Sequence, residues 1–194
     1  MPRKTDTKER ILTEAMALIR DRGYCSVGVD DILKAANAGK SSFYHFFESK
    51  EALGAAVLDA YSRMADEGIL RRAFAFDVPP LERPLRFAEM IRAEGAPLEG
   101  VFAGLFASDN GHVSEVIRSK AVEMIERVVA QFERAFVEAV ARMELYPDAP
   151  SRRLAQACVC YCEGALLMAR LTENREILDQ VSPLMRGIWK PYLV

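Results

Sequence analysis

The chain has 194 residues, of which 51% are hydrophobic and 28% are charged, and its formal net charge is -2. This composition excludes an intrinsically disordered chain, and the length allows one large domain or two small ones. No run of about 18 apolar residues occurs, and the polar N-terminal segment has no signal-peptide core, so we expect no membrane partner and a cytoplasmic location.

The charge is distributed unevenly along the chain. Residues 1–50 carry nine Lys and Arg against seven Asp and Glu, whereas residues 51–194 carry 17 against 21. The first part therefore has a net charge of +2 and the second a net charge of -4. This asymmetry is compatible with a polyanion-binding N-terminal domain, but charge alone does not establish one.

Four cysteines are present: Cys25, Cys158, Cys160 and Cys162. On a helix, residues i and i+2 point about 200° apart, so the three thiols of "CVCYC" cannot all ligate one metal. The spacing also differs from the paired C-x-x-C of zinc sites. We therefore expect reduced, structural thiols and no metal, and we keep a redox-sensing thiol as the alternative.

The first predicted helix runs from Asp6 to Gly23, because its apolar residues recur every three or four positions and its ends carry suitable capping residues. A second, short helix follows Gly28 with apolar residues at i, i+3, i+4 and i+7. Asn37 tolerates the left-handed conformation that ends a helix and turns the chain.

A third short helix is predicted from Gly39 to Phe47, and Ser49 caps a fourth. A tight turn between two short amphipathic helices is the pattern of a helix-turn-helix, whose second helix enters the major groove of DNA. Three apolar side chains would anchor this second helix to a three-helix core: Phe43, Phe46 and Phe47.

The other residues of this helix are polar or small, as contact with DNA requires. Lysine neutralises phosphate, hydroxyls donate to phosphate oxygens or base edges, and small residues allow the backbone to approach the duplex. Periodicity alone leaves a plain solvated helix face open as the alternative. The residues that we expect to bind DNA are Gly39, Lys40, Ser41, Ser42, Tyr44, His45 and Lys50.

Residues 8–58 resemble the DNA-binding domain of TetR-family transcriptional regulators. Three positions depart from the family pattern, because Asn37 replaces a turn Gly, Gly39 replaces a capping Ser or Thr, and Ser41 stands where Gly is frequent. The matching residues occur in order and without gaps: Asp31-Ile32, Ala35-Ala36, Lys40, Ser42-Phe43-Tyr44-His45-Phe46-Phe47 and Ser49-Lys50-Glu51-Ala52-Leu53.

The resemblance implies an all-α fold, with an N-terminal three-helix helix-turn-helix domain and a larger C-terminal helical domain for ligand binding and dimerisation. We place the DNA-binding domain at residues 1–50 and the effector-binding and dimerisation domain at 51–194, linked by the fourth helix. The stretch "APLEGVFAGLF" and the long helix after it resemble one subgroup of the family. Pro- and Gly-containing segments interrupt the rest of the chain, and between them we predict helices near 50–74, 81–94, 98–108, 112–145, 151–172 and 174–190.

The predicted helix 151–172 carries a seam of small residues at alternating spacings of three and four. Such a seam allows close helix packing, either within one chain or across a dimer. The resemblance favours the dimer, as a two-fold four-helix contact between protomers. The seam residues are Ala155, Cys158, Cys162, Ala165 and Ala169.

An effector pocket, which the resemblance also implies, would lie among the middle helices. Aromatic and Met side chains at helical spacing could line it, although the same pattern is typical of plain core. The candidates are Tyr61, Phe87, Met90, Phe102, Phe106, Phe132 and Met168, with Phe74 and Phe76 as further ones.

No phosphate-binding loop, nucleophile elbow or H-E-x-x-H motif occurs, and the chain has two histidines, so we expect no enzyme, no catalytic residue and no cofactor. The predicted function is that of a homodimeric TetR-like repressor that binds a palindromic operator in double-stranded DNA. A small, largely apolar effector would release it. The alternatives are a thiol- or electrophile-responsive regulator of the same fold, an all-α adaptor that binds only protein, and an unrecognised α-helical enzyme.

Overall fold

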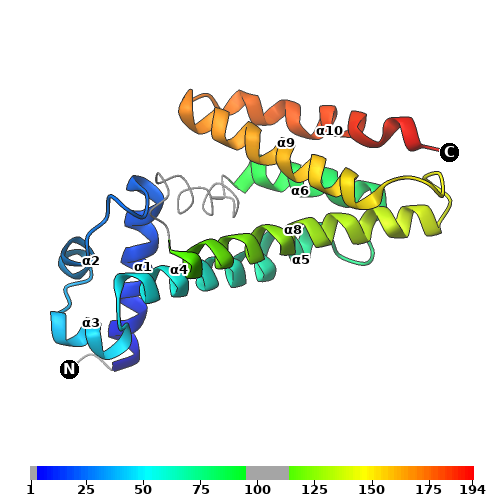
Figure 1. Ribbon diagram of the computed structural model, residues 1–194. Coiled ribbons are helices and arrows are strands. Elements are labelled where there is room, and N and C mark those ends of the chain that lie inside the picture. Colours follow the sequence, from blue (N-terminus) through cyan, green and yellow to red (C-terminus); the bar gives the residue numbers. More distant parts are fainter. Residues whose placement is uncertain (1–3, 95–113) are drawn as a thin grey trace. The chain divides into compact units, whose positions relative to one another are not determined.

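The structure is a computed structural model that describes residues 4–94 and 114–194 (Figure 1). These residues are helical without a β-strand, apart from an isolated bridge between Leu145 and Leu193, so the predicted all-α fold is confirmed. The α-helices are α1 Lys4–Arg22, α2 Val29–Ala35, α3 Lys40–Phe46, α4 Lys50–Ala65, α5 Arg71–Ala73, α6 Arg83–Glu94, α8 Glu115–Ala141, α9 Ser151–Leu171 and α10 Val181–Trp189. Short 3-10 or π segments are η1 Asp66–Leu70, η2 Pro80–Glu82, η3 Arg175–Gln180 and η4 Lys190–Tyr192.

The described residues form two compact units. The first contains residues up to 63 together with 114–124, and the second contains 64–94 together with 125–194. The division thus falls within α4 and α8, whereas the sequence suggested a domain boundary at residue 50. The predicted helix 98–108 and the stretch "APLEGVFAGLF" lie outside the described residues, as do Phe102 and Phe106.

Local backbone chemistry determines where the first helices end. Gly23 adopts a left-handed conformation with φ 82°, and its N–H donates to the carbonyl of Ile19 at 2.8 Å, which terminates α1. Asn37 adopts φ 45° after α2, as predicted from its tolerance of this region. Since α1 already includes Lys4, the predicted helix start at Asp6 lies inside the helix.

Helix starts use different caps. The N–H of Gly28 donates to the Asp31 carboxylate at 2.9 Å ahead of α2, and the hydroxyl of Ser49 accepts from the N–H of Ala52 at 3.0 Å ahead of α4. Gly39 precedes α3 without a side-chain cap. The predicted helix 50–74 corresponds to three helical segments that follow one another without a gap, because a π-helical turn, η1, separates α4 from α5.

The core of the first unit joins α1, α2, α3 and α4 with the first turns of α8. Phe43 and Phe47 are buried in it as predicted, whereas Phe46 is only partly buried. The apolar stripe of α1 contributes Ile11, and α8 contributes Ile117. This core holds α3 against α1 and leaves its polar face outside.

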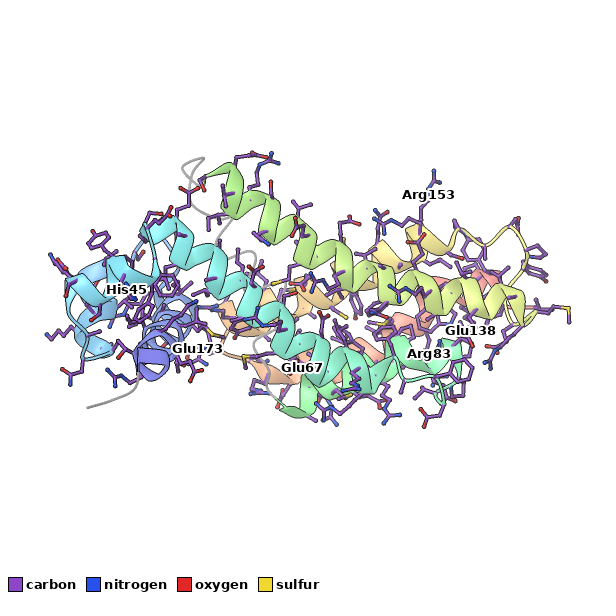
Figure 2. The ribbon with its side chains drawn as sticks, turned by 90° about the horizontal axis from the view of Figure 1, so that it is seen from below. His45, Glu67, Arg83, Glu138, Arg153 and Glu173 are labelled. Carbon is purple, nitrogen blue, oxygen red and sulfur yellow. The ribbon has the colours of Figure 1, made fainter. Side chains whose placement is uncertain are left out.

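In the second unit, α10 packs on α6 and α9. Its interior includes Phe136, whose ring lies 5.4 Å from that of Trp189. An ion pair with a buried cation also stabilises this unit, because the buried Arg83 donates to the partly exposed Glu138 and to the carbonyl of Val78 at 2.8 Å (Figure 2). The ion pair holds the start of α6 against the last turn of α8.

Candidate nucleic-acid interface

The outer face of α3 consists of exposed polar side chains. Lys40, Ser41, Tyr44 and His45 occupy positions i, i+1, i+4 and i+5, which share one face of a helix, and all four are exposed. Tyr44 is a large side chain with 61% of its surface exposed. The buried Phe43 fixes this face outward from the opposite side of the helix.

The start of α3 is open to a close approach. A Cβ at Gly39 would meet only the Ser41 hydroxyl, at 3.9 Å, so the backbone there is uncovered. Gly39 has an extended conformation, φ -87° and ψ 156°, and its carbonyl accepts from the N–H groups of Ser42 and Phe43. Ser42 is half-buried, so it is less available to an outside partner than the other predicted residues.

Lys40 has a partner that the sequence reading did not anticipate. Its ammonium lies 3.0 Å from the carboxylate of Asp30 on α2, with both side chains exposed. The hydrogen bond to Asp30 and its charge raise the pKa of Lys40. Lys40 is therefore a cation whose charge is partly compensated before any polyanion arrives.

Lys50 is held at the start of α4. Its ammonium lies 4.5 Å from the ring centroid of Tyr24 and donates to the carbonyl of Cys25 at 3.5 Å. Tyr24 was not selected from the sequence, although a single aromatic residue directly after the helix-ending Gly23 was the available signal. Two basic residues of α1 contact the helix-turn-helix. Arg10 donates to the carbonyl of Ala36 in the turn at 3.3 Å, and the Lys8 ammonium lies over the Phe47 ring at the end of α3.

Two of the predicted effector residues lie together in the second unit. The rings of Phe87 on α6 and Phe132 on α8 are 5.2 Å apart, and Phe74 lies 5.9 Å and 4.9 Å from them. Phe132 is fully buried and Phe87 nearly so. The three rings form an aromatic cluster, which is the only part of the predicted wall that the described residues assemble.

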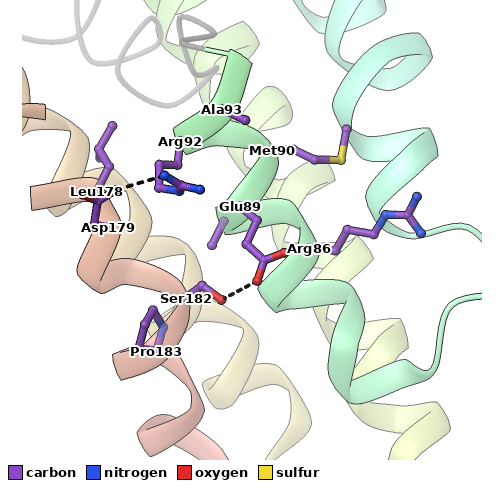
Figure 3. A pocket seen from close by; sticks show the side chains of 10 residues that line it. Arg86, Glu89, Met90, Arg92, Ala93, Leu178, Asp179, Ser182 and Pro183 are labelled. Atoms are coloured by element: carbon purple, nitrogen blue, oxygen red, sulfur yellow. Dashed lines mark hydrogen bonds and ion pairs between the residues drawn. The ribbon is translucent and has the colours of Figure 1, made fainter. Parts of the chain in front are cut away.

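The other predicted wall residues are separate from this cluster. Tyr61 is buried in the core of the first unit, and Met168 is exposed on α9, as is Phe76 on the loop after α5. Met90 lies on α6 and lines a surface groove of about 610 Å³ between α6 and the η3–α10 segment (Figure 3). Met90 is thus the predicted wall residue that borders this groove.

The groove is lined by charged as well as apolar side chains. Two contacts link its walls: Arg92 lies 3.2 Å from Asp179, and the hydroxyl of Ser182 donates to Glu89 at 3.2 Å (Figure 3). The remaining polar side chain on its lining is Arg86. The groove is therefore more polar than the apolar pocket expected from the sequence.

The small seam of α9 lies in the interior of the second unit. Its residues are at most 7% exposed and belong to the same core as α6, α8 and α10. The seam therefore packs within the chain and is not open to a second protomer. The buried seam residues are Ala155, Cys158, Cys162, Ala165 and Ala169.

The opposite face of α9 is exposed and mostly apolar. Its residues follow the same alternating three-and-four spacing, and a Cβ at Gly164 in their midst would meet no atom within 4 Å. We call this face the outer stripe of α9. Its exposed members are Ala157, Cys160, Gly164, Leu167, Met168 and Leu171.

Burial separates the thiols into two classes. Burial raises the pKa of the Cys158 thiol to about 12 and raises that of Cys162 well above its ordinary value. Such thiols hold little reactive thiolate at neutral pH. Cys25 and Cys160 are exposed.

A left-handed turn between two short helices, a second helix with a polar outer face and a shared three-helix core define a helix-turn-helix DNA-binding protein. Residues 11–57 match the family described as bacterial regulatory proteins, tetR family, and residues 85–183 match the LmrA/YxaF-like transcriptional regulator C-terminal domain. The chain belongs to the TetR family of transcriptional regulators.

Relatives cover nearly the whole chain. The transcriptional regulator AcuR of Cereibacter sphaeroides is 32% identical over 84% of this chain and 76% of its own. The transcriptional repressor DhaR of Mycobacterium sp. strain GP1 is 29% identical over 91% of this chain and 89% of its own. The crystal structure of regulatory protein TetR from Rhodobacter sphaeroides superposes with a TM-score of 0.83 at 29% identity, covering 94% and 98% of the two chains.

The protein is therefore a DNA-binding transcriptional regulator, and its relatives are regulators, not enzymes. TetR-family regulators bind DNA operators and small-molecule effectors as dimers. Among the described helices, α9 has the length and composition of a membrane-spanning helix, with 44% of its apolar window buried in the protomer. Since one face lies in the core, α9 has the character of a core helix.

Proposed function

We propose that the protein is a cytoplasmic, homodimeric repressor that binds a palindromic operator and is released by a small, largely apolar effector. The observation that carries the DNA-binding part is the exposed polar face of α3, which is fixed by the buried Phe43 behind it. Each protomer would place α3 in one major groove, with two half-sites related by the dimer axis.

The roles of the α3 side chains follow from their chemistry. Lys40 and Lys50 would contact phosphates, because an ammonium on a flexible stem acts as a point charge. Ser41, Tyr44 and His45 would reach base edges or phosphates, and the uncovered backbone at Gly39 would permit close approach. Ser42 contributes less because it is half-buried.

The outer stripe of α9 is the surface that we propose for the dimer. Leu167, Met168 and Leu171 each expose half or more of their surface, and Gly164, about one turn before them, leaves room for a partner helix. On α10, Leu184 is 59% exposed and a Cβ at Gly187 would also meet no atom within 4 Å. Exposed apolar residues beside open glycines favour close helix contacts between two copies of the chain.

For the effector, we propose the second unit. The aromatic cluster of Phe74, Phe87 and Phe132 supplies an apolar wall, and Met90 lies on the same helix as Phe87. An effector releases DNA only if it binds the DNA-free conformation more tightly than the bound one. Trp189 is the single tryptophan of the chain and packs in this unit, so its fluorescence would report effector binding.

The DNA-binding proposal is tested by selecting bound duplexes from random DNA and titrating the best one across salt concentrations. We expect a palindromic site, and Lys50→Ala should lower the slope of log affinity against log salt by about 1 per protomer. Lys190→Ala, at an exposed position of η4, is the matched control and should leave the slope unchanged. Failure to enrich any sequence would overturn the proposal.

A further inference from the structure

We propose that Tyr24 is a positioning residue for DNA binding, whose ring holds the ammonium of Lys50 in place and is itself positioned by Gly54, which Ile117 also approaches. The proposal rests on the proposed function, in which Lys50 contacts a phosphate. It assigns a DNA-binding role to three residues that do not face the duplex side of α3.

The Tyr24 ring contacts α4 at two positions that are one helical turn apart. The Lys50 ammonium lies 4.5 Å from the ring centroid. A Cβ built on Gly54 would lie 2.7 Å from Cε2 of Tyr24 and 2.9 Å from Cδ1 of Ile117. Both separations are shorter than van der Waals contact, so the ring and the Ile117 side chain already fill the space that any larger residue would need.

A glycine inside a helix lowers the stability of that helix, and the close approach of the Tyr24 ring explains why a glycine stands at position 54. Gly54 lies inside α4, where a glycine is about 1 kcal/mol less favourable than alanine. The residue is buried, and the atom that a Cβ would meet first belongs to a rigid aromatic ring. Gly54 therefore sets how closely Tyr24 approaches α4, which is the helix that begins with Lys50.

Holding Lys50 in place matters because a free lysine side chain has many rotamers. The ring face attracts the ammonium, and the carbonyl of Cys25 accepts from it at 3.5 Å. A cation that is already oriented loses less side-chain entropy when a phosphate binds. Burial raises the pKa of Tyr24 to about 12, so the ring stays neutral at the pH of any binding experiment.

Ile117 connects this arrangement to α8. Its side chain is fully buried and approaches Gly54, and it lies in the first turns of α8. The same helix carries Phe132 of the aromatic cluster, 15 residues further along. Gly54 therefore lies against both the Tyr24 ring and the Ile117 side chain, and through Ile117 the arrangement adjoins the start of α8.

The test is a double-mutant cycle on operator affinity, measured by fluorescence anisotropy with the full-length chain. Tyr24→Leu should weaken binding about two- to fivefold per protomer, from the usual strength of an exposed cation–π contact. The loss should disappear in the Lys50→Ala background, because the ring then has no cation to hold. Tyr24→Phe keeps the ring face and should retain wild-type affinity.

Two further measurements separate positioning from folding. In the folded wild type, the ring current of Tyr24 should shift the Lys50 ε-methylene protons upfield in NMR spectra. Gly54→Ala should displace the ring, reduce that shift and weaken binding only when Lys50 is present. An equal loss for Tyr24→Leu with and without Lys50 would overturn the positioning role while leaving the repressor proposal intact. If the Lys50→Ala variant instead binds operator with wild-type affinity, Lys50 makes no phosphate contact. That result would overturn both the proposed role of Lys50 and the positioning role of Tyr24.

Discussion

Gly164 and Ala165 are consecutive residues of α9 that face opposite environments. Ala165 is 7% exposed and packs in the core of its own protomer, whereas a Cβ at Gly164 would meet no atom within 4 Å. A helix turns by about 100° per residue, so neighbours can lie on a buried and an open face. The pair therefore separates the stability of the protomer from contact between protomers.

The first prediction compares arginine at these two positions. Gly164→Arg should leave each protomer folded but produce monomers in light scattering, because two long cations would meet across the proposed dimer contact. Ala165→Arg should instead lower the melting temperature of the second unit strongly, since a charge would enter a packed core. A Gly164→Arg variant that remains dimeric would place the contact on another surface.

The second prediction concerns the ion pair between Asp30 and Lys40. Asp30→Asn should strengthen binding to any duplex several-fold, because the freed ammonium would contact phosphate and a carboxylate would leave the interface. Asp31→Asn is the control, since Asp31 caps α2 through Gly28 and should affect stability more than affinity. If Asp30 instead orients Lys40 for DNA, Asp30→Asn will weaken binding in the same anisotropy titration.

The third prediction concerns alkaline pH. The pKa of Cys158 rises from its ordinary value of 9.0 to about 12 in the folded chain, so the unfolded chain deprotonates first. The contribution of the neutral thiol to stability is complete below pH 9 and decreases as pH rises toward 12. The Cys158 thiol should then lower the free energy of unfolding by about 1.4 kcal/mol per pH unit in that window, and the buried Cys162 thiol, whose pKa is also raised, should add to the decline.

The measurement for this third prediction is urea unfolding between pH 8 and pH 11. Cys158→Ala should show a shallower decline than the wild type, because it lacks the titrating group. Cys160→Ala replaces an exposed thiol and serves as the control. Identical pH slopes for the wild type and Cys158→Ala would contradict the raised pKa.

The fourth prediction addresses the thiol-responsive alternative. Because Cys158 and Cys162 are buried with raised pKa values, we expect operator release by apolar compounds to persist in a chain with all four cysteines replaced by Ser or Ala. Release by peroxide or an electrophile in the wild type, with none in this variant, would establish a thiol sensor. The exposed Cys25 and Cys160 would then be the residues to restore singly.

The fifth prediction concerns the buried Arg83. Its side chain is 6% exposed and donates to Glu138, so Arg83→Met should lower the free energy of unfolding by about 3 kcal/mol or more. Arg142→Ala removes the exposed partner of the Glu138 carboxylate and should change the free energy of unfolding by at most about 1 kcal/mol. If both variants lower the free energy of unfolding equally in urea, the burial of Arg83 adds nothing to stability beyond an exposed ion pair.

The ion pair of Arg83 and Glu138 should also make the stability of the protein depend on acid pH. The hydrogen bond from Arg83 lowers the pKa of Glu138, so the ion pair contributes stability above the ordinary glutamate range. That contribution is lost as pH falls through the lowered pKa of the folded state. The Arg83→Met variant should therefore lose less stability than the wild type between pH 5 and acid.

Local signals in the sequence determined the N-terminal part of this protein. The end of α1 at Gly23, the turn at Asn37 and the polar face of α3 were all predicted, because backbone preferences and helical spacing act over a few residues. The helix-turn-helix pattern followed from the same signals, whereas the TetR-like motif and the two-domain all-α fold were inferred from the family resemblance of residues 8–58. The ion pair of Lys40 with Asp30 did not follow, since it depends on how α2 and α3 cross.

Only the tertiary structure decided which face of α9 is buried. Two stripes on this helix have the same three-and-four spacing, one through Ala165 and one through Gly164, and the sequence reading chose the first for the dimer. Packing against α6, α8 and α10 covers the stripe of Ala165. Tyr24 illustrates the same limit, because its contacts with Lys50 and Gly54 join segments far apart in the chain. Periodicity records that a helix has an apolar face, whereas the partner of that face depends on the long-range packing of the whole core.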